Sequence, residues 1–440
     1  MQGRDSFKST IEKIPIVDTH EHVVSLAEVR SRPLNVFSVF ANSYARLDFI
    51  SAGMPAQAWE GVDEPDYIWP IFREYQPFVR HTSFYRNMIK ALQDLFGLEE
   101  DEITEKNQRE LSYSITKAYK RQDWYDYVLR ERAKMAVGLL DTFWSVEKFT
   151  FDPALFKPVL RCNPFIWGPA YELPYVSGKT NHTKVEIVAK EFGLAINSLE
   201  DYLKLISSVI KRYKEAGAPN IKICTAYQRT LKFHPVSRKR ALQLYNRVGD
   251  LTPEERLELQ DFIAHYIIEA AIAEDLPIQI HTGILARNRA TLSDSSPEHL
   301  NSLFLRYPEA RFVILHFGFP YTQQAISLAK MFPNVYIDLV WLPLLSPVAA
   351  KETLNVCLDL VPTNKIMCGG DAYRAEEAYA SLSLLRDTVA DVLYERVERG
   401  ILNSGEALQI AQRIFFENAI KFFSLPLEGG CADMLRDYKV

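Results

Sequence analysis

The sequence predicts an α/β protein, a (β/α)8 TIM barrel with a helical insertion after its first strand. Short β-branched runs alternate with longer amphipathic stretches, which is the pattern of βα units and a parallel sheet. Polar residues end several of these runs, as they do at the active face of such barrels. At 440 residues, 48% of them hydrophobic, the chain can bury one large core.

Eight segments are predicted strands because they are short and nearly continuous in apolar residues, as buried parallel strands are. They span residues 14–18, 134–140, 156–162, 220–225, 277–281, 311–316, 334–339 and 365–370. Eight strands with helices between them favour a closed barrel over an open sheet.

Helix start signals support the positions of the intervening helices. Thr252, Pro253 and Glu255 form a capping box with proline at the first helical position, which predicts a helix over residues 254–274. Ser198, with Asp201 three residues later, begins the helix before the fourth strand. Further helices are expected from residue 297 onward and over residues 376–399 and 404–423.

Residues 23–133 separate the first two strands and are far longer than a βα loop. Helical patterns occur there near residues 84–96 and 111–120. We interpret the segment as a cap over the barrel mouth, within a single barrel domain that spans residues 1–440. An independent N-terminal domain is the alternative, but the strand before the segment belongs to the barrel.

Composition narrows the partners and the compartment. The formal charge of −5 and the lack of Lys or Arg runs argue against nucleic acid as a partner. No secretory signal or bilayer-spanning apolar segment is evident, so we expect a cytoplasmic protein without a membrane partner. Five scattered cysteines indicate neither a disulfide framework nor a thiolate zinc site. Apolar surface on the insertion could bury a homo-oligomer interface or cover the barrel.

Histidine and aspartate side chains end four of the predicted strands. His20 and His22 end the first strand and share one face, His281 ends the fifth, His316 ends the sixth and Asp371 follows the eighth. Each alone could be a strand-end histidine bonded to a carbonyl, or a helix-capping aspartate. Because the C-terminal strand ends of a barrel meet at its mouth, their joint occurrence predicts a metal site.

Lys222 lies within the apolar fourth strand. An ammonium group there either extends outward between helices or faces the barrel interior, where its desolvation needs a carboxylate or a functional purpose. We favour a cation that pairs with Asp371 or faces the substrate. The alternative is a lysine carbamylated by carbon dioxide, which would bridge two metals.

With these residues in place, the sequence resembles the amidohydrolase superfamily, whose barrels carry H-x-H after strand one, histidines at strands five and six, and aspartate at strand eight. The positions that match in order are His20, His22, His281, His316 and Asp371. Residues 276–283 and 332–338 are similar to the amidohydrolase-related branch, which includes decarboxylases and nodulin-like domains. The long insertion is similar to that of uronate isomerase.

The resemblance implies one divalent metal, zinc or alternatively manganese, held by His20, His22, His281 and Asp371. It also implies catalytic roles: Asp371 would take a proton from an activated water, and His316 would polarise the carbonyl of the substrate. Lys222 is the third predicted catalytic residue.

Residues on the loops after the strands are predicted to bind a small-molecule substrate. Arg229 and Arg374 suit a carboxylate, with Tyr227 beside them, and Trp341 would supply an apolar wall. Arg287 and Arg289 lie on the same kind of loop.

The leading hypothesis for function is hydrolysis of a C–N or C–O bond, in an amide, lactone or ester of a small carboxylated compound. A nonhydrolytic decarboxylation or uronate-type isomerisation is the first alternative, because the same residues support it. A noncatalytic binding scaffold is the second.

Overall fold

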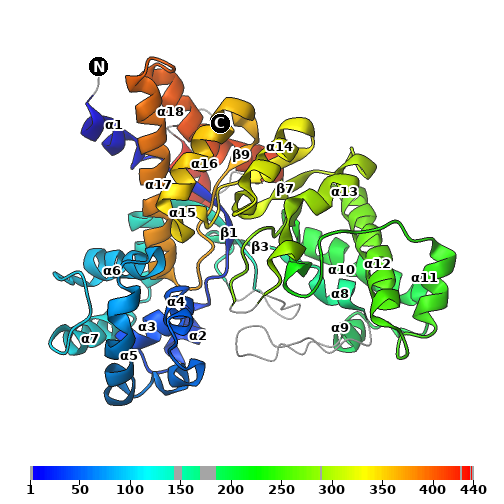
Figure 1. Cartoon of the computed structure of the whole chain (residues 1–440), viewed down its shortest axis with the longest axis horizontal. Helices are drawn as coiled ribbons and strands as arrows, with labels where there is room; N and C mark the ends of the chain where they lie inside the picture. The colour runs from blue at the N-terminus through cyan, green and yellow to red at the C-terminus, as the bar shows by residue number, and fades with distance from the viewer. Residues whose placement is uncertain are drawn as a thin grey trace.

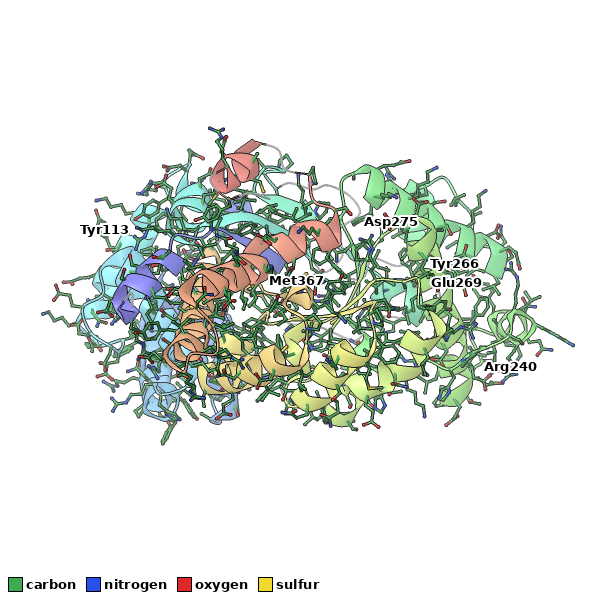
Figure 2. The ribbon with its side chains drawn as sticks, turned by 90° about the horizontal axis from the view of Figure 1, so that it is seen from above. Tyr113, Arg240, Tyr266, Glu269, Asp275 and Met367 are labelled. Carbon is green, nitrogen blue, oxygen red and sulfur yellow. The ribbon has the colours of Figure 1, made fainter. Side chains whose placement is uncertain are left out.

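The computed structural model describes residues 3–142, 151–168, 185–287, 290–426, 429–436 and 438. Its parallel strands lie in the middle of the molecule, between two groups of helices (Figure 1). Seen from above, Tyr113 and Arg240 lie near opposite ends, and Met367 lies between them (Figure 2).

All eight predicted strands are present in the described part of the chain, most of them shorter than expected. They are β1 (Ile16–Glu21), β2 (Met135–Leu140), β3 (Phe156–Pro158) with β4 (Leu160–Arg161), β5 (Ile221–Ile223), β6 (Ile278–Ile280), β7 (Phe312–Ile314), β8 (Val335–Asp338) and β9 (Ile366–Met367). β3 and β4 correspond to the single predicted strand over 156–162. Every pairing is parallel, in the orders β1-β2-β3 and β4-β5-β6-β7-β8-β9.

Backbone hydrogen bonds connect the two sheets into a ring. β3 and β4 follow each other directly, and the Val159 amide between them donates to the Leu140 carbonyl at 2.9 Å. At the other junction, the Thr19 amide donates to the Cys368 carbonyl at 3.2 Å and the His22 amide donates to the Ala372 carbonyl at 3.0 Å. The chain therefore forms the predicted TIM barrel, with β9 beside β1.

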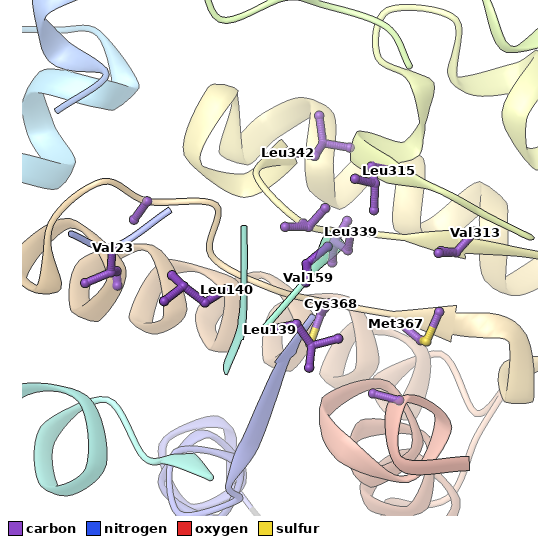
Figure 3. Close-up of a cluster of buried hydrophobic side chains, with 14 of the residues drawn as sticks. Val23, Leu139, Leu140, Val159, Val313, Leu315, Leu339, Leu342, Met367 and Cys368 are labelled. Carbon is purple, nitrogen blue, oxygen red and sulfur yellow. The ribbon is translucent and has the colours of Figure 1, made fainter. Parts of the chain in front are cut away.

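The strands are buried because they face the barrel interior on one side and helices on the other. One continuous core contains fully buried side chains from three separate strands, Leu139, Val313 and Met367. Figure 3 shows these side chains among the apolar cluster where the strands converge. This packing fixes the strand ends that carry the polar residues.

The helices after β2 surround the barrel. They are α8 (Asn163–Trp167), α9 (Val185–Glu191), α10 (Leu199–Glu215), η3 (Thr225–Tyr227), α11 (Arg238–Tyr245), α12 (Pro253–Ala273), η4 (Leu292–Ser295), η5 (Pro297–Leu300), α13 (Asn301–Arg306), η6 (Leu315–Gly318), α14 (Thr322–Met331), α15 (Leu342–Leu345), α16 (Pro347–Leu360), η7 (Thr363–Lys365), α17 (Ala375–Glu398), α18 (Ser404–Gln412), η8 (Arg413–Glu417), α19 (Asn418–Phe423) and α20 (Gly429–Leu435). The predicted capping box at Thr252 is present, and the Ser198 hydroxyl caps α10 as expected.

The insertion is helical, and α1 precedes β1. The elements are α1 (Arg4–Ile11), α2 (Leu26–Arg30), α3 (Val36–Ala41), α4 (Ala45–Ser51), η1 (Ala56–Gly61), α5 (Pro65–Val79), α6 (Ser83–Phe96), α7 (Asn107–Ala118) and η2 (Asp126–Arg132). Helix α17 packs against α6 at one end and α1 at the other (Figure 1). That the insertion caps a single barrel domain stays a prediction. Within the described residues, no helix has the length and apolar character that a bilayer crossing requires.

Candidate metal centre

The first histidine pair, His20 and His22, projects from the end of β1. Their Nε2 atoms lie 3.3 Å apart, and Nδ1 of His22 lies 2.6 Å from the carbonyl oxygen of Asp141. Because a carbonyl only accepts, we assign the His22 proton to Nδ1, which leaves the Nε2 lone pair facing His20. Burial lowers the pKa of His22 to about 3 and the pKa of His20 well below its usual value, so both rings are neutral metal-ligand forms.

Asp371 follows β9 in a backbone conformation that L-residues seldom adopt, with φ of 57°. Its amide donates to the His20 carbonyl at 2.8 Å, and the amide of Gly370 donates to Asp18 Oδ1 at 2.9 Å. A Cβ atom on Gly370 would collide with Glu21 Oε1. A larger residue at this turn would displace the buried Glu21 carboxylate, and the turn places Asp371 beside β1.

His20, His22 and Asp371 form a buried triad whose candidate ligand atoms all lie within 4.8 Å of one another. Two neutral imidazoles and one carboxylate are the donor types that zinc prefers. The ring atom Nδ1 of His20 is also buried, without a hydrogen-bond partner among the described residues. The residues present therefore fit the divalent metal that the sequence predicted.

The second histidine pair, His281 and His316, comes from β6 and β7. Nδ1 of His281 lies 3.0 Å from Nε2 of His316, while His281 Nε2 faces the Ile284 carbonyl at 3.0 Å and His316 Nδ1 faces the Val340 carbonyl at 3.2 Å. If the two nitrogens that face carbonyls carry the protons of the neutral rings, the other two nitrogens, His281 Nδ1 and His316 Nε2, have only lone pairs, and these face each other. A cation or a shared proton is needed between them. His281, the predicted fourth ligand, thus lies against His316 and outside the triad.

Asp371 lies between the two histidine pairs. Its Oδ1 is 3.6 Å from His22 Nε2, and its Oδ2 is 3.7 Å from His316 Nε2. The hydroxyl of Tyr44, from the insertion, donates to Asp371 Oδ1 at 3.0 Å. Burial raises the pKa of Asp371 to about 6, against the opposing effects of Lys222 and the Tyr44 hydrogen bond. A carboxylate with such a pKa can exchange protons near neutral pH.

Lys222 faces the barrel interior, as one of its two predicted orientations required. Its Nζ contacts His20 Nε2 and lies 3.6 Å from Asp141 Oδ2. Arg161 donates to Asp141 Oδ2 from Nε at 2.9 Å and from Nη2 at 2.7 Å. Burial lowers the pKa of Lys222, and Asp141 opposes this shift. Lys222 therefore pairs with Asp141, whereas Asp371 or the substrate was the partner expected from the sequence.

Three residues of this site were missed from the sequence. Asp141 directly follows β2, and Arg161 ends β4. Both obey the rule of polar residues at strand ends, and that rule would have found them. Tyr44 lies between two short helices of the insertion, where no strand-end signal exists, and only the fold brings it to Asp371.

Aromatic rings surround the two histidine pairs. The Trp341 ring lies 5.1 Å from that of His316, and Tyr227 lies 5.0 Å from His281. Trp341 also packs on Tyr44, with ring centroids 4.8 Å apart. The structure thus brings predicted residues Trp341 and Tyr227 to the site.

The three predicted arginines that the structure describes lie in different surroundings. Arg229 is buried and donates to Asp261 Oδ1 at 2.6 Å and to several carbonyls, so its guanidinium fixes a loop to α12. The prediction that Arg229 binds the substrate is therefore wrong, because its guanidinium is paired with Asp261. Arg374 is buried, and its charge acts on two tyrosines of the insertion. Arg287 donates to the Tyr227 carbonyl, and Arg289 lies outside the described residues.

Comparisons with known proteins now bear on this site. Residues 231–425 match the family model described as Amidohydrolase. This match covers less than half of the chain and indicates a domain of the amidohydrolase family in its C-terminal part. A stretch of 151 residues, 34% of the chain, is 36% identical to the protein fluG of Emericella nidulans. That match spans 17% of the length of fluG.

Solved structures share the fold of this chain over nearly its whole length. The uronate isomerase of Thermotoga maritima has a TM-score of 0.76 at 15% sequence identity. The alignment covers 96% of this chain and 99% of the isomerase chain. The glucuronate isomerase of Caulobacter crescentus has a TM-score of 0.76 at 16% identity, with 97% and 95% covered. At such identities the likeness establishes the barrel architecture alone.

Proposed function

We propose that this protein is a metal-dependent hydrolase that adds water across a C–N or C–O bond of a small, carboxylated amide, lactone or ester. The observation that carries the proposal is the position of Asp371, whose two oxygens face one histidine of each pair. The match of residues 231–425 to the amidohydrolase family model supports the same chemistry.

His20, His22 and Asp371 would hold the divalent metal, for which zinc is the first candidate and manganese the second. When bound, such a cation supplies Lewis-acid chemistry by polarising an oxygen of the substrate or of water. The neutral state of both rings leaves their lone pairs available for it.

Asp371 would accept a proton from the attacking water and deliver it to the leaving group, because its buried carboxylate faces both histidine pairs. The hydroxyl of Tyr44 would hold Oδ1 in place during this transfer. His316 faces Oδ2 of Asp371, and when the second histidine pair holds the shared proton between its rings, Nε2 of His316 would donate a hydrogen bond to the oxygen on which negative charge develops.

The walls of the site suggest the shape and charge of the substrate. Lys222 and Arg161 place cationic groups beside the first histidine pair, which suits a substrate that carries a carboxylate. Trp341 and Tyr227 would pack against its carbon skeleton.

Isomerisation of a uronate-type sugar is the second candidate, because the barrel and the insertion together match two uronate isomerase structures along nearly the whole chain. With a metal held by the same triad, a carbonyl and a neighbouring hydroxyl would then be polarised. Asp371 would carry the proton that leaves the hydroxyl-bearing carbon to the carbonyl carbon, while the hydroxyl proton passes to the carbonyl oxygen.

One experiment separates the candidates. The zinc-loaded protein and the His20→Ala/His22→Ala double variant are incubated with panels of lactones, amides and uronates, and products are identified by mass spectrometry. Hydrolysis adds the mass of one water, isomerisation leaves the mass unchanged and decarboxylation removes carbon dioxide. We expect water addition by the wild type alone. Equal product from the double variant, or no metal in the wild type, would contradict the proposal and favour the binding scaffold.

A further inference from the structure

Glu377, in the first turn of α17, connects the insertion to the loop after β9. Its Oε1 accepts a hydrogen bond from the Tyr44 amide at 2.8 Å, and its Oε2 accepts one from the Tyr373 amide at 3.0 Å. The side chain is buried, with 1% of its surface exposed. A buried carboxylate with one backbone donor on each oxygen fixes two segments relative to each other.

Both segments that Glu377 holds carry a side chain that contacts the metal triad. The hydroxyl of Tyr44 donates to Asp371 Oδ1 at 3.0 Å. The ring of Tyr373 stacks on His22, with centroids 5.6 Å apart and planes inclined by 19°. One carboxylate therefore orients the neighbours of two of the three candidate ligands.

The preceding residue, Glu376, offers a natural control. It is equally buried and also binds the insertion, through the hydroxyl of Tyr119 at 2.9 Å and the indole nitrogen of Trp124 at 3.2 Å. Among the described residues, the hydrogen bonds of the Tyr119 and Trp124 side chains go to Glu376 and not to the triad. Glu376 therefore anchors the insertion by a route separate from Asp371.

From this arrangement we propose that Glu377 is a positioning residue, which holds the Tyr44 hydroxyl and the Tyr373 ring against the metal triad. The inference rests on the proposed function, because it presupposes a metal at His20, His22 and Asp371. It adds that the insertion is part of the metal site, since its docking through Glu377 sets the orientation of Asp371. Groups of this kind orient the ligands and raise metal affinity.

The test is a double-mutant cycle read as zinc affinity, measured by competition with a chromophoric chelator. Glu377→Gln keeps the side-chain size but leaves an amide donor facing one backbone N–H. We expect Glu377→Gln and Tyr44→Phe each to weaken zinc binding by about 10-fold to 100-fold. Because Tyr44 is one of the two groups that Glu377 positions, the loss of zinc affinity in the double variant should be smaller than the sum of the two single effects.

Glu376→Gln is the matched control, expected to lower the melting temperature while leaving zinc affinity nearly unchanged. Equal zinc affinities for the two glutamine variants, or fully additive effects in the cycle, would overturn the inference. If Glu377→Gln does not fold, Glu377→Asp takes its place. Aspartate keeps both acceptor oxygens, but its side chain is one methylene shorter and holds them farther from the Tyr44 and Tyr373 amides. A wild type that binds no zinc would instead refute the proposed function.

Discussion

The two histidine pairs at the barrel mouth are alike in one respect and differ in their surroundings. In each pair, nitrogen atoms of neighbouring rings face each other and an outer nitrogen contacts a backbone carbonyl. Lys222 and Asp141 lie beside the first pair, whereas Trp341 and Tyr227 lie beside the second. Only the first pair completes a three-ligand set with Asp371 in the described part of the chain.

This difference shows that equivalent positions in a barrel acquire separate roles through their neighbours. Asp371 reaches both pairs, but its backbone is bonded to β1, so it belongs structurally to the first. We infer a division in which the first pair holds the metal and the second pair handles a proton near the substrate.

Removal of each pair in turn gives the largest expected effect. His20→Ala/His22→Ala should abolish stoichiometric zinc binding, measured by metal analysis of protein purified without chelator. His281→Ala/His316→Ala should retain about one zinc and lose activity. Loss of zinc from the second variant would show that both pairs bind metal and would remove the distinction.

The turn that carries Asp371 between the pairs offers the next test. Gly370→Ala would push a methyl group against Glu21, and we expect the free energy of unfolding to fall by about 1 to 3 kcal/mol. Zinc affinity should fall with it, because Asp371 shifts. Gly249→Ala is the control, since a Cβ atom there meets no atom within 4 Å. Urea titration measures the free energy of unfolding of both variants. Equal stabilities of Gly370→Ala and Gly249→Ala would refute the steric argument.

The charged surroundings of the first pair can be altered at Lys222. Lys222→Met should strengthen zinc binding by about tenfold, because it removes an amine that contacts His20 Nε2 and whose charged form repels a cation. Lys365→Met removes another buried lysine, which contacts carbonyls elsewhere, and should leave zinc affinity unchanged. Weaker binding in Lys222→Met, with loss of a second metal equivalent, would instead indicate a carbamylated lysine.

The smallest expected effect concerns a property that the two pairs share. Burial lowers the pKa values of His22 and His316 to about 3, whereas a histidine in the unfolded chain has a pKa of about 6.5. Between these values the unfolded chain binds protons that the native metal-free protein does not, so stability falls as the pH falls. Each buried histidine contributes at most about 1.4 kcal/mol per pH unit.

Replacement of either histidine by glutamine should therefore make this acid destabilisation shallower by a similar amount. Urea unfolding of chelator-treated protein between pH 5 and pH 7 measures the slope. A slope unchanged in both variants would show that the imidazoles are protonated in the native state, contrary to the assignment.

Much of the architecture was predictable because it depends on local patterns. Apolar runs predicted all eight strands, and the capping box at Thr252 and the N-cap Ser198 predicted where α12 and α10 begin. The barrel rule then brought His20, His22 and Asp371 to one mouth from distant parts of the chain. Strand lengths were overestimated, since residues such as His281 and His316 continue the apolar runs but lie beyond the hydrogen-bonded ladders.

The sequence by itself determined the barrel, two helices of the insertion (α6 and α7) and the residue types at the mouth, because periodicity and strand-end position are properties of neighbouring residues. Only the tertiary structure decided that His281 pairs with His316, that Lys222 meets Asp141 and that Tyr44 and Glu377 connect the insertion to Asp371. These contacts depend on side-chain directions across segments up to 333 residues apart, and no local pattern records such directions.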